Sequence, residues 1–346
     1  MKARVSSTQL QSRGYPSVTV VVPTQERPLL LSRQLESLLA LAYQSEQLDI
    51  IVVGGSDDPG REEVERITRS SAFLLNYCAV PDAVLGSASF KRNVGAELAR
   101  GEILAFTDDD CTVDRNWVAA AVRYFTGSDV GGVEGAVHIP RPARPTPTYR
   151  GSLRLSLPGG YQTCNIFYRK AVFEQCGGFD LAFPYYLEDT DIAYSVMERG
   201  YRIVYASDAI VSHPVPTGRP LKAFVVARTV EQMPYLYFKH PQSLEGLKNS
   251  VRPFNKSHYV YLALYLVSLL ILIGSPLLAL EVLAIGLGIL VPLQLVHDHW
   301  GLHVGLVELF LIALCQPIVP ALRLFYWIKG LLVLHLRRWG PRLANG

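Results

Sequence analysis

Between Ser17 and about Ala209, short apolar runs alternate with amphipathic stretches whose apolar residues recur three and four positions apart. The runs predict buried strands, and the stretches predict helices that lie on a sheet. The expected strands are residues 18–22, 48–53, 74–79 and 103–106, and the expected helices are residues 29–41, 61–69, 90–99 and 116–125. This alternation predicts an α/β fold with a mostly parallel sheet flanked by helices. Such sheets bind ligands at the carboxyl ends of their strands, so a site is expected in the loops after Val22, Val53 and Phe106.

The last part of the chain is far more apolar and predicts membrane segments over residues 258–336. Two uncharged runs, residues 259–280 and 282–296, are separated only by Glu281. Together they favour a hairpin of two transmembrane helices. A third apolar region, residues 306–336, contains charged and proline residues and is expected to be interfacial, re-entrant or spanning. The alternative is an apolar helical subdomain of a soluble protein.

Basic residues flank this apolar part on both sides. They are Lys239, Lys248, Arg252 and Lys256 before it, and Arg337, Arg338 and Arg342 in the basic tail 337–346. The positive-inside rule then predicts that both flanks are cytosolic. The polar tail 1–16 lacks the apolar core of a signal peptide, so we expect the part before the apolar runs to face the cytoplasm. Residues 214–257 mix aromatic and basic side chains and predict an amphipathic region at the membrane interface.

Composition narrows the class of protein further. The 346-residue chain has a formal net charge of only +3, and its basic residues are spread along the sequence. This distribution does not indicate a basic surface that would bind nucleic acid. The five cysteines are odd in number and form no CxxC pair, which argues against a zinc site and a disulfide framework and favours a reducing, cytosolic setting.

Three adjacent carboxylates, Asp108, Asp109 and Asp110, follow the apolar run 103–106 and so lie at the ligand end of the predicted sheet. Their mutual repulsion is tolerable if a hard cation such as Mg²⁺ or Mn²⁺ binds there, and that cation can also hold a diphosphate. In an extended segment Asp108 and Asp110 face one side, while Asp109 faces the other side or engages the backbone. The alternative is a solvated acidic turn.

A second carboxylate group begins an amphipathic helix that runs to about Arg199. Its members are Glu188, Asp189 and Asp191. The helix dipole favours carboxylates at this end, so helix capping is one interpretation.

Four blocks of the sequence resemble the inverting family 2 glycosyltransferases, which have the GT-A fold. The blocks are VTVVVPTQERP, FKRNVGAELARGEILAFTDDDC, CGGFD and LEDTDIAYSVMERGYRIVYASDAIVSH. They resemble, in order, the first nucleotide-contacting loop, the approach to the metal-binding DxD motif, the acceptor side and the catalytic-base region. The resemblance implies a GT-A catalytic domain over residues 17–213, with a donor half 17–139 and an acceptor half 140–213.

This resemblance implies a role for each matching residue. Asp110 and Asp108 would bind a divalent Mn or Mg ion, with Asp110 the more direct ligand, and His213 would complete the metal site. The residues expected to contact a nucleotide-sugar donor or to support the DxD loop are Pro23, Thr24, Glu26, Asp57, Asp58, Arg92, Asn93, Asp108 and Asp109. Among the catalytic carboxylates Glu188, Asp189 and Asp191, Asp189 would be the general base that takes a proton from the acceptor hydroxyl. Attack opposite the leaving group would invert the anomeric carbon.

Two departures from the family pattern limit what the resemblance implies. The family usually ends its second strand in an aspartate that reads the base, but here Val53 is followed by GGSDD. Either Asp57 or Asp58 takes over this role or base reading differs, so the donor base stays open. The QxxRW motif of processive enzymes is absent after Thr190, and we therefore expect transfer of a single sugar.

The sequence thus predicts a membrane-attached, metal-dependent, inverting glycosyltransferase. Its acceptor is expected to be a lipid-linked or membrane-proximal glycan, in cell-envelope or exopolysaccharide synthesis. One alternative is a polyprenyl-phosphate sugar synthase, and another, from a different class, is a non-catalytic membrane scaffold that retains the fold. A nucleotidyltransferase is disfavoured because VVPTQERPLL lacks the glycine-rich phosphate loop that such an enzyme would carry after its first strand. The sugar, the acceptor, the number of spans and the oligomeric state stay open.

Overall fold

The computed structural model describes residues 16–69, 74–81, 87–184, 186–215, 222–242, 252–299, 302 and 304–343. The chain forms two compact units, and each is described by itself. Unit 1 comprises Met1–Pro140 and Ser152–Val215, and unit 2 comprises Arg141–Gly151 and Pro216–Gly346. Residues 141–151, at the start of the expected acceptor half, therefore group with unit 2.

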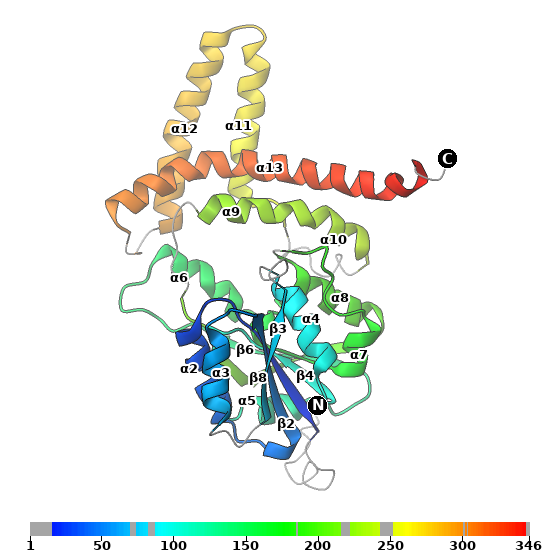
Figure 1. Ribbon diagram of the computed structural model, residues 1–346. Helices are drawn as coiled ribbons and strands as arrows, with labels where there is room; N and C mark the ends of the chain where they lie inside the picture. Colours follow the sequence, from blue (N-terminus) through cyan, green and yellow to red (C-terminus); the bar gives the residue numbers. More distant parts are fainter. Residues whose placement is uncertain are drawn as a thin grey trace, which may run out of the picture. The chain divides into compact units, whose positions relative to one another are not determined.

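Unit 1 is built on an eight-stranded sheet of order β3-β2-β1-β4-β7-β6-β8-β5 (Figure 1). The strands are β1 Val18–Pro23, β2 Leu48–Gly55, β3 Leu74–Val80, β4 Ile103–Phe106, β5 Thr112–Val113, β6 Val130–His138, β7 Ile166–Arg169 and β8 Arg202–Ser212. The first four strands are parallel, as predicted, whereas β7 pairs antiparallel with both β4 and β6. The expected α/β fold is confirmed, with a mixed sheet whose parallel part carries the predicted ligand-binding loops.

The central strand β1 shows why these residues form a buried sheet. All six of its residues are buried, and most are β-branched, which suits a strand covered on both faces. Val20 of β1 pairs with Ile50 of β2 on one side and Ala105 of β4 on the other. The carboxyl ends of these three parallel strands therefore meet at one edge.

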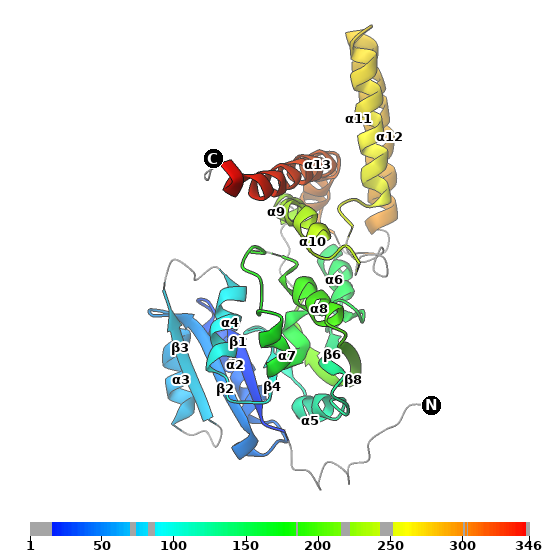
Figure 2. The same cartoon turned by 90° about the vertical axis from the view of Figure 1, so that its right-hand side faces the viewer.

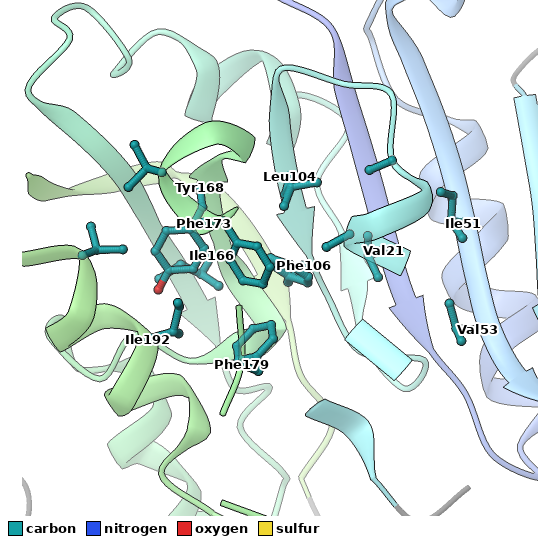
Figure 3. Close-up of a cluster of buried hydrophobic side chains, with 14 of the residues drawn as sticks. Val21, Ile51, Val53, Leu104, Phe106, Ile166, Tyr168, Phe173, Phe179 and Ile192 are labelled. Atoms are coloured by element: carbon teal, nitrogen blue, oxygen red, sulfur yellow. The ribbon is translucent and has the colours of Figure 1, made fainter. Parts of the chain in front are cut away.

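Helices cover both faces of the sheet in unit 1. They are α2 Pro28–Leu39, α3 Gly60–Thr68, α4 Ala88–Leu98, α5 Trp117–Val122, α7 Lys170–Gln175 and α8 Glu188–Glu198, with short 3-10 turns η1 Ser45–Gln47, η3 Leu153–Ser156 and η4 Thr163–Asn165. A core cluster joins α4, α7 and α8 to one face, with Phe106, Phe173 and Phe179 at its centre (Figure 3). The Phe106 and Phe179 ring centroids lie 5.2 Å apart. The close approach of α4 to β1 requires Gly95, since a Cβ there would lie 2.4 Å from Val21 Cγ1.

Unit 2 is helical in its described residues. Its helices are α6 Pro147–Ser152, whose last residue falls in unit 1, α9 Lys222–Arg228, η5 Thr229–Gln232, α10 Met233–Lys239, α11 Lys256–Leu272, α12 Pro276–His299 and α13 Leu306–Leu343. Helices α11 and α12 lie side by side as a hairpin (Figures 1 and 2). By length and composition, Pro276–Asp298 and Leu306–Leu336 are long and apolar enough to cross a membrane, whereas Lys256–Leu272 is a shorter apolar helix.

The break between the two hairpin helices was expected at Glu281, and that expectation is wrong. The structure places it at Gly274 and Ser275, and Pro276 begins α12. Proline lacks a backbone N–H and favours the first position of a helix, so it ends one helix and starts the next. A single glutamate does not end a helix, and Glu281 lies within α12.

The charged residues of α13 contact other parts of unit 2. Lys329 Nζ lies 2.8 Å from Glu231 Oε1, and Arg323 Nε donates to the Pro253 carbonyl at 2.6 Å. Gly330 permits this packing, because a Cβ there would lie 2.2 Å from the Glu231 carbonyl oxygen. Two of the charges that interrupt this apolar run, on Arg323 and Lys329, therefore have partners within unit 2.

Candidate active site

The loops after β1, β2 and β4 meet at one edge of the sheet in unit 1. Thr24, which follows β1, donates its backbone N–H to the Val53 carbonyl at 2.9 Å and its hydroxyl to Asp109 Oδ2 at 2.9 Å. Pro23 is the last residue of β1 and pairs with Val53. The structure therefore brings the first predicted loop into direct contact with the aspartate triplet.

Asp58 fastens the loops after β1 and β2 to each other. Its Oδ2 accepts the N–H of Glu26 and its Oδ1 accepts the N–H of Gly60, both at 2.8 Å. Glu26 has a φ of 54°, a conformation that non-glycine residues seldom adopt, so this hydrogen bond also holds a strained position. Asp58 is buried, whereas Asp57 is exposed and remains the candidate for contact with a donor base.

The three carboxylates of the triplet are held by two arginines and by neighbouring polar side chains. Asp108 Oδ1 lies 2.7 Å from Arg92 Nη2, and Asp109 is held by Thr24 and by Arg27, whose Nη1 lies 3.2 Å from Asp109 Oδ1. Burial raises the pKa of Asp109, and the Thr24 hydrogen bond opposes that shift. Asp110 Oδ1 lies 3.9 Å from His213 Nε2, and its Oδ2 lies 3.4 Å from the same Arg27 Nη1. The Arg92 and Arg27 guanidinium groups offset the repulsion between the adjacent carboxylates.

The group that could hold a metal ion consists of Asp110, Cys111 and His213, whose ligand atoms lie within 4.8 Å of one another. His213 Nδ1 lies 2.7 Å from the Pro214 carbonyl, which accepts its hydrogen bond, and Nε2 faces Asp110. A hydrogen bond with Cys164, together with burial, raises the pKa of Cys111. A carboxylate and an imidazole suit Mn²⁺, and a soft sulfur ligand does not. The residues present therefore fit a divalent metal through Asp110 and His213, while Asp108 lies against Arg92 instead.

Arg92 joins the two carboxylate groups that the sequence singles out. Only 4% of its side chain is exposed, and its Nη1 lies 3.3 Å from Glu188 Oε1 while Nη2 contacts Asp108. Burial opposes its charge, but the Asp108 and Glu188 carboxylates raise the pKa of Arg92. The neighbouring Asn93 instead exchanges hydrogen bonds with the backbone of Phe179, at 2.8 and 2.9 Å, and so ties α4 to the CGGFD turn.

The first turn of α8 carries the predicted base. Asp189 Oδ1 accepts the Thr190 N–H at 2.7 Å, and burial and the charge of Glu188 raise the pKa of Asp189 to about 7. Asp191 is 1% exposed and lies inside the fold. Of the three predicted catalytic carboxylates, Glu188 and Asp189 lie at the Arg92 bridge and Asp191 does not.

Two basic residues at the site were missed by the sequence analysis. Arg27 contacts Asp109 and Asp110, and the buried Lys91 donates to the Thr24 carbonyl at 2.7 Å. Burial lowers the pKa of Lys91, and the nearby Asp58 and Asp109 charges oppose that shift. Both residues lie inside the blocks quoted for the family resemblance, but only the fold shows which carboxylates they face.

Known proteins are similar to this chain in sequence. Residues 16–233 match the family described as "Glycosyltransferase like family 2". Glycosyltransferase AglE of Haloferax volcanii is 27% identical over 218 residues, which cover 60% of this chain and 70% of that protein. The succinoglycan biosynthesis protein ExoM of Rhizobium meliloti is 28% identical over 224 residues, which cover 61% of this chain and 71% of that protein. The glucosyl-dolichyl phosphate glucuronosyltransferase of Haloferax volcanii is 27% identical over 219 residues, which cover 57% of this chain and 68% of that protein.

A solved structure agrees with the fold. The mannosyltransferase PcManGT from Pyrobaculum calidifontis, in complex with GDP-Man and Mn²⁺, is similar with a TM-score of 0.58 at 18% identity, covering 92% of this chain and 88% of that one. This likeness confirms the GT-A type of fold. Because the family match extends over more than half of the chain and includes both carboxylate groups of the site, this chain belongs to the glycosyltransferase-like family 2.

Proposed function

We propose that the chain is an inverting, metal-dependent glycosyltransferase that moves a single sugar from a nucleotide-sugar donor to a lipid-linked or membrane-proximal glycan. The observation that carries this proposal is the Arg92 bridge, with Asp108 at 2.7 Å and Glu188 at 3.3 Å. The buried Arg92 guanidinium holds Asp108, on the donor side of the proposed site, close to Glu188, which adjoins the proposed base Asp189. This arrangement suits a displacement in which the leaving group and the nucleophile meet at one carbon.

Asp110 and His213 are the residues that would hold Mn²⁺ or Mg²⁺. When bound, such an ion would neutralise charge on the donor diphosphate. The hydrogen bond from His213 Nδ1 to the Pro214 carbonyl orients the ring for this task. Asp108, held by Arg92, would support the donor side of the site and position the loop.

Asp189 would act as the general base. As the acceptor hydroxyl oxygen bonds to the anomeric carbon, the bond from that carbon to the diphosphate oxygen breaks, the electron pair leaves with the diphosphate, and the hydroxyl proton passes to Asp189. Its pKa of about 7 makes it a stronger base than an ordinary carboxylate near neutral pH. Attack from the face opposite the leaving group inverts the carbon.

The acceptor and the location are inferred from unit 2 and from the relatives. The apolar helices α12 and α13 favour membrane attachment, and the flanking basic residues favour a catalytic domain that faces the cytoplasm. The names of two relatives refer to glucosyl-dolichyl phosphate and to succinoglycan, which favours a lipid-linked glycan acceptor here. If the acceptor is instead a bare polyprenyl phosphate, the product would be a sugar phospholipid.

The test is transfer by the full-length protein in nanodiscs, with a panel of nucleotide sugars and either Mn²⁺ or Mg²⁺. Asp110→Ala is expected to abolish transfer, and Asp189→Asn to reduce it by about 10²- to 10⁴-fold. Asp208→Asn is the matched control, because Asp208 pairs with Arg123 on the surface of unit 1, and it should retain full activity. Folded wild-type protein that neither binds a donor nor depends on metal would refute the proposal and favour the scaffold alternative.

A further inference from the structure

Arg27 lies beside the carboxylates of the candidate metal site. Its Nη1 lies 3.2 Å from Asp109 Oδ1 and 3.4 Å from Asp110 Oδ2. Asp110 therefore faces Arg27 through one oxygen and His213 through the other. An ion held by Asp110 and His213 would be separated from this guanidinium by a single carboxylate.

The backbone of Arg27 is fixed from both sides. The preceding residue, Glu26, is held by Asp58, and the Arg27 carbonyl accepts the N–H groups of Leu30 and Leu31 at 3.1 and 3.0 Å. Pro28 follows directly and begins α2. The main chain at Arg27 is thus held independently of the contacts that its side chain makes.

Two nitrogens of the Arg27 guanidinium are available to donate hydrogen bonds to a ligand. It is 53% exposed, and within the described part of the chain only Nη1 makes hydrogen bonds, while Nη2 and Nε do not. A guanidinium presents its N–H groups as a planar fork that matches phosphate oxygens. Ion pairs with an exposed partner contribute little to stability, so the fold gains little from this arginine.

We infer that Arg27 binds the diphosphate of the nucleotide-sugar donor and stabilises the charge that develops on it as the sugar leaves. The inference rests on the proposed function. In that step the bond between the anomeric carbon and the diphosphate oxygen breaks, and the electron pair passes to the diphosphate. Arg27 keeps its protons and donates hydrogen bonds to the phosphate oxygens, which stabilises the transition state more than the ground state.

The test compares ligand binding by calorimetry for the full-length protein in nanodiscs. The variants are Arg27→Gln, Arg27→Lys and, as matched control, Arg61→Gln, whose side chain is 52% exposed and pairs with Glu65. The probes are Mn²⁺ alone, and GDP, UDP, inorganic diphosphate, GMP and UMP with Mn²⁺. Arg27→Gln should weaken diphosphate binding by about 10- to 100-fold, the usual range for hydrogen bonds to a charged group. Binding of Mn²⁺ alone and of the monophosphates should change by less than about threefold, Arg27→Lys should fall between, and Arg61→Gln should match wild type.

The outcomes separate this inference from the proposed function. Unchanged diphosphate affinity in Arg27→Gln, in a protein that still transfers sugar, would overturn the inference alone. An equal loss of affinity for the nucleoside monophosphates and diphosphates in Arg27→Gln would also overturn it. The substitution would then have disturbed the loop after β1 and not a contact with the second phosphate group. Arg27-dependent diphosphate binding in a protein that transfers no sugar would uphold the binding role of Arg27 and overturn both its role in the reaction and the proposed function. A wild type that binds none of the diphosphates would overturn both.

Discussion

His213 presents its Nε2 atom 3.9 Å from Asp110 Oδ1, while its Nδ1 atom lies 2.7 Å from the Pro214 carbonyl. The two residues come from different parts of unit 1, since Asp110 follows β4 and His213 follows β8. The hydrogen bond to Pro214 fixes the ring so that Nε2 is directed at the carboxylate. The two residues meet because β5, which follows Asp110, pairs with the end of β8, with Thr112 opposite Ser212.

Replacing His213 with alanine should therefore weaken Mn²⁺ binding by at least about 10- to 100-fold. Loss of a residue that only hydrogen-bonds to a metal ligand already has an effect of that size. The measurement is Mn²⁺ titration followed by electron paramagnetic resonance. His138→Ala is the matched control, because His138 is exposed, and its carbonyl, which accepts the His213 N–H at 2.9 Å, survives the substitution. Equal Mn²⁺ affinity in both variants would rule out His213 as a ligand.

Activity should depend on the protonation of Asp189. Burial and Glu188 raise its pKa to about 7, and a general base works only when deprotonated. We expect kcat/KM to fall about tenfold per pH unit below that pKa and to level off above it. Asp189→Asn should reduce kcat by about 10²- to 10⁴-fold and remove this limb of the profile. A flat wild-type profile between pH 5 and 8 would contradict the assignment.

Replacing Arg92 with methionine should affect both stability and the pH profile. Without their shared cation, Asp108 and Glu188 are left partly buried, at 28% and 16% exposure, and the free energy of unfolding should fall by about 2 to 3 kcal/mol, below the range for fully buried pairs. Arg92 also lowers the pKa of Asp189, so the residual activity should need a higher pH. Denaturant unfolding and pH–rate profiles measure the two effects.

Two variants serve as controls for Arg92. Arg92→Lys keeps the charge and should keep the pH profile closer to wild type. Arg202→Met removes an exposed pair with Asp129 and should change stability by less than about 1 kcal/mol. A pH profile that stays in place in Arg92→Met would show that Arg92 acts only on the fold.

Alanine substitution of the adjacent residues Asp57 and Asp58 should affect different properties, donor binding for Asp57 and stability for Asp58. Asp58→Ala leaves the N–H groups of Glu26 and Gly60 without their acceptor, and stability should fall by about 1 to 3 kcal/mol for each group that stays buried. Asp57→Ala, at an exposed position, should change stability by less than about 0.5 kcal/mol but raise the KM for the donor. Thermal unfolding and donor kinetics, measured on both variants, distinguish the two roles. An unchanged donor KM in Asp57→Ala would remove this residue from the donor site.

The local pattern was enough to find the parallel part of the sheet. The strands expected at 18–22, 48–53, 74–79 and 103–106 match β1 to β4 to within two residues. These strands are buried and have continuous apolar runs, which a local window detects. The rest of the sheet has weaker patterns: β8 mixes buried, half-buried and exposed residues, and the edge strand β5 has only two residues. The helix break at Gly274 to Pro276 was missed because hydropathy reports the lack of charge and not where a helix ends.

The sequence by itself determined the α/β class, the family, the position of the aspartate triplet at a strand end and the carboxylates that begin α8. Each of these depends on residues close together in the chain. Only the tertiary structure decided which group each carboxylate faces. Arg92 joins Asp108 to Glu188 because α4 and α8 pack into the same core cluster, and His213 reaches Asp110 because β5 pairs with β8, with Thr112 opposite Ser212. Contacts between residues so far apart in the chain depend on the order in which strands pair, and that order leaves no trace in local periodicity.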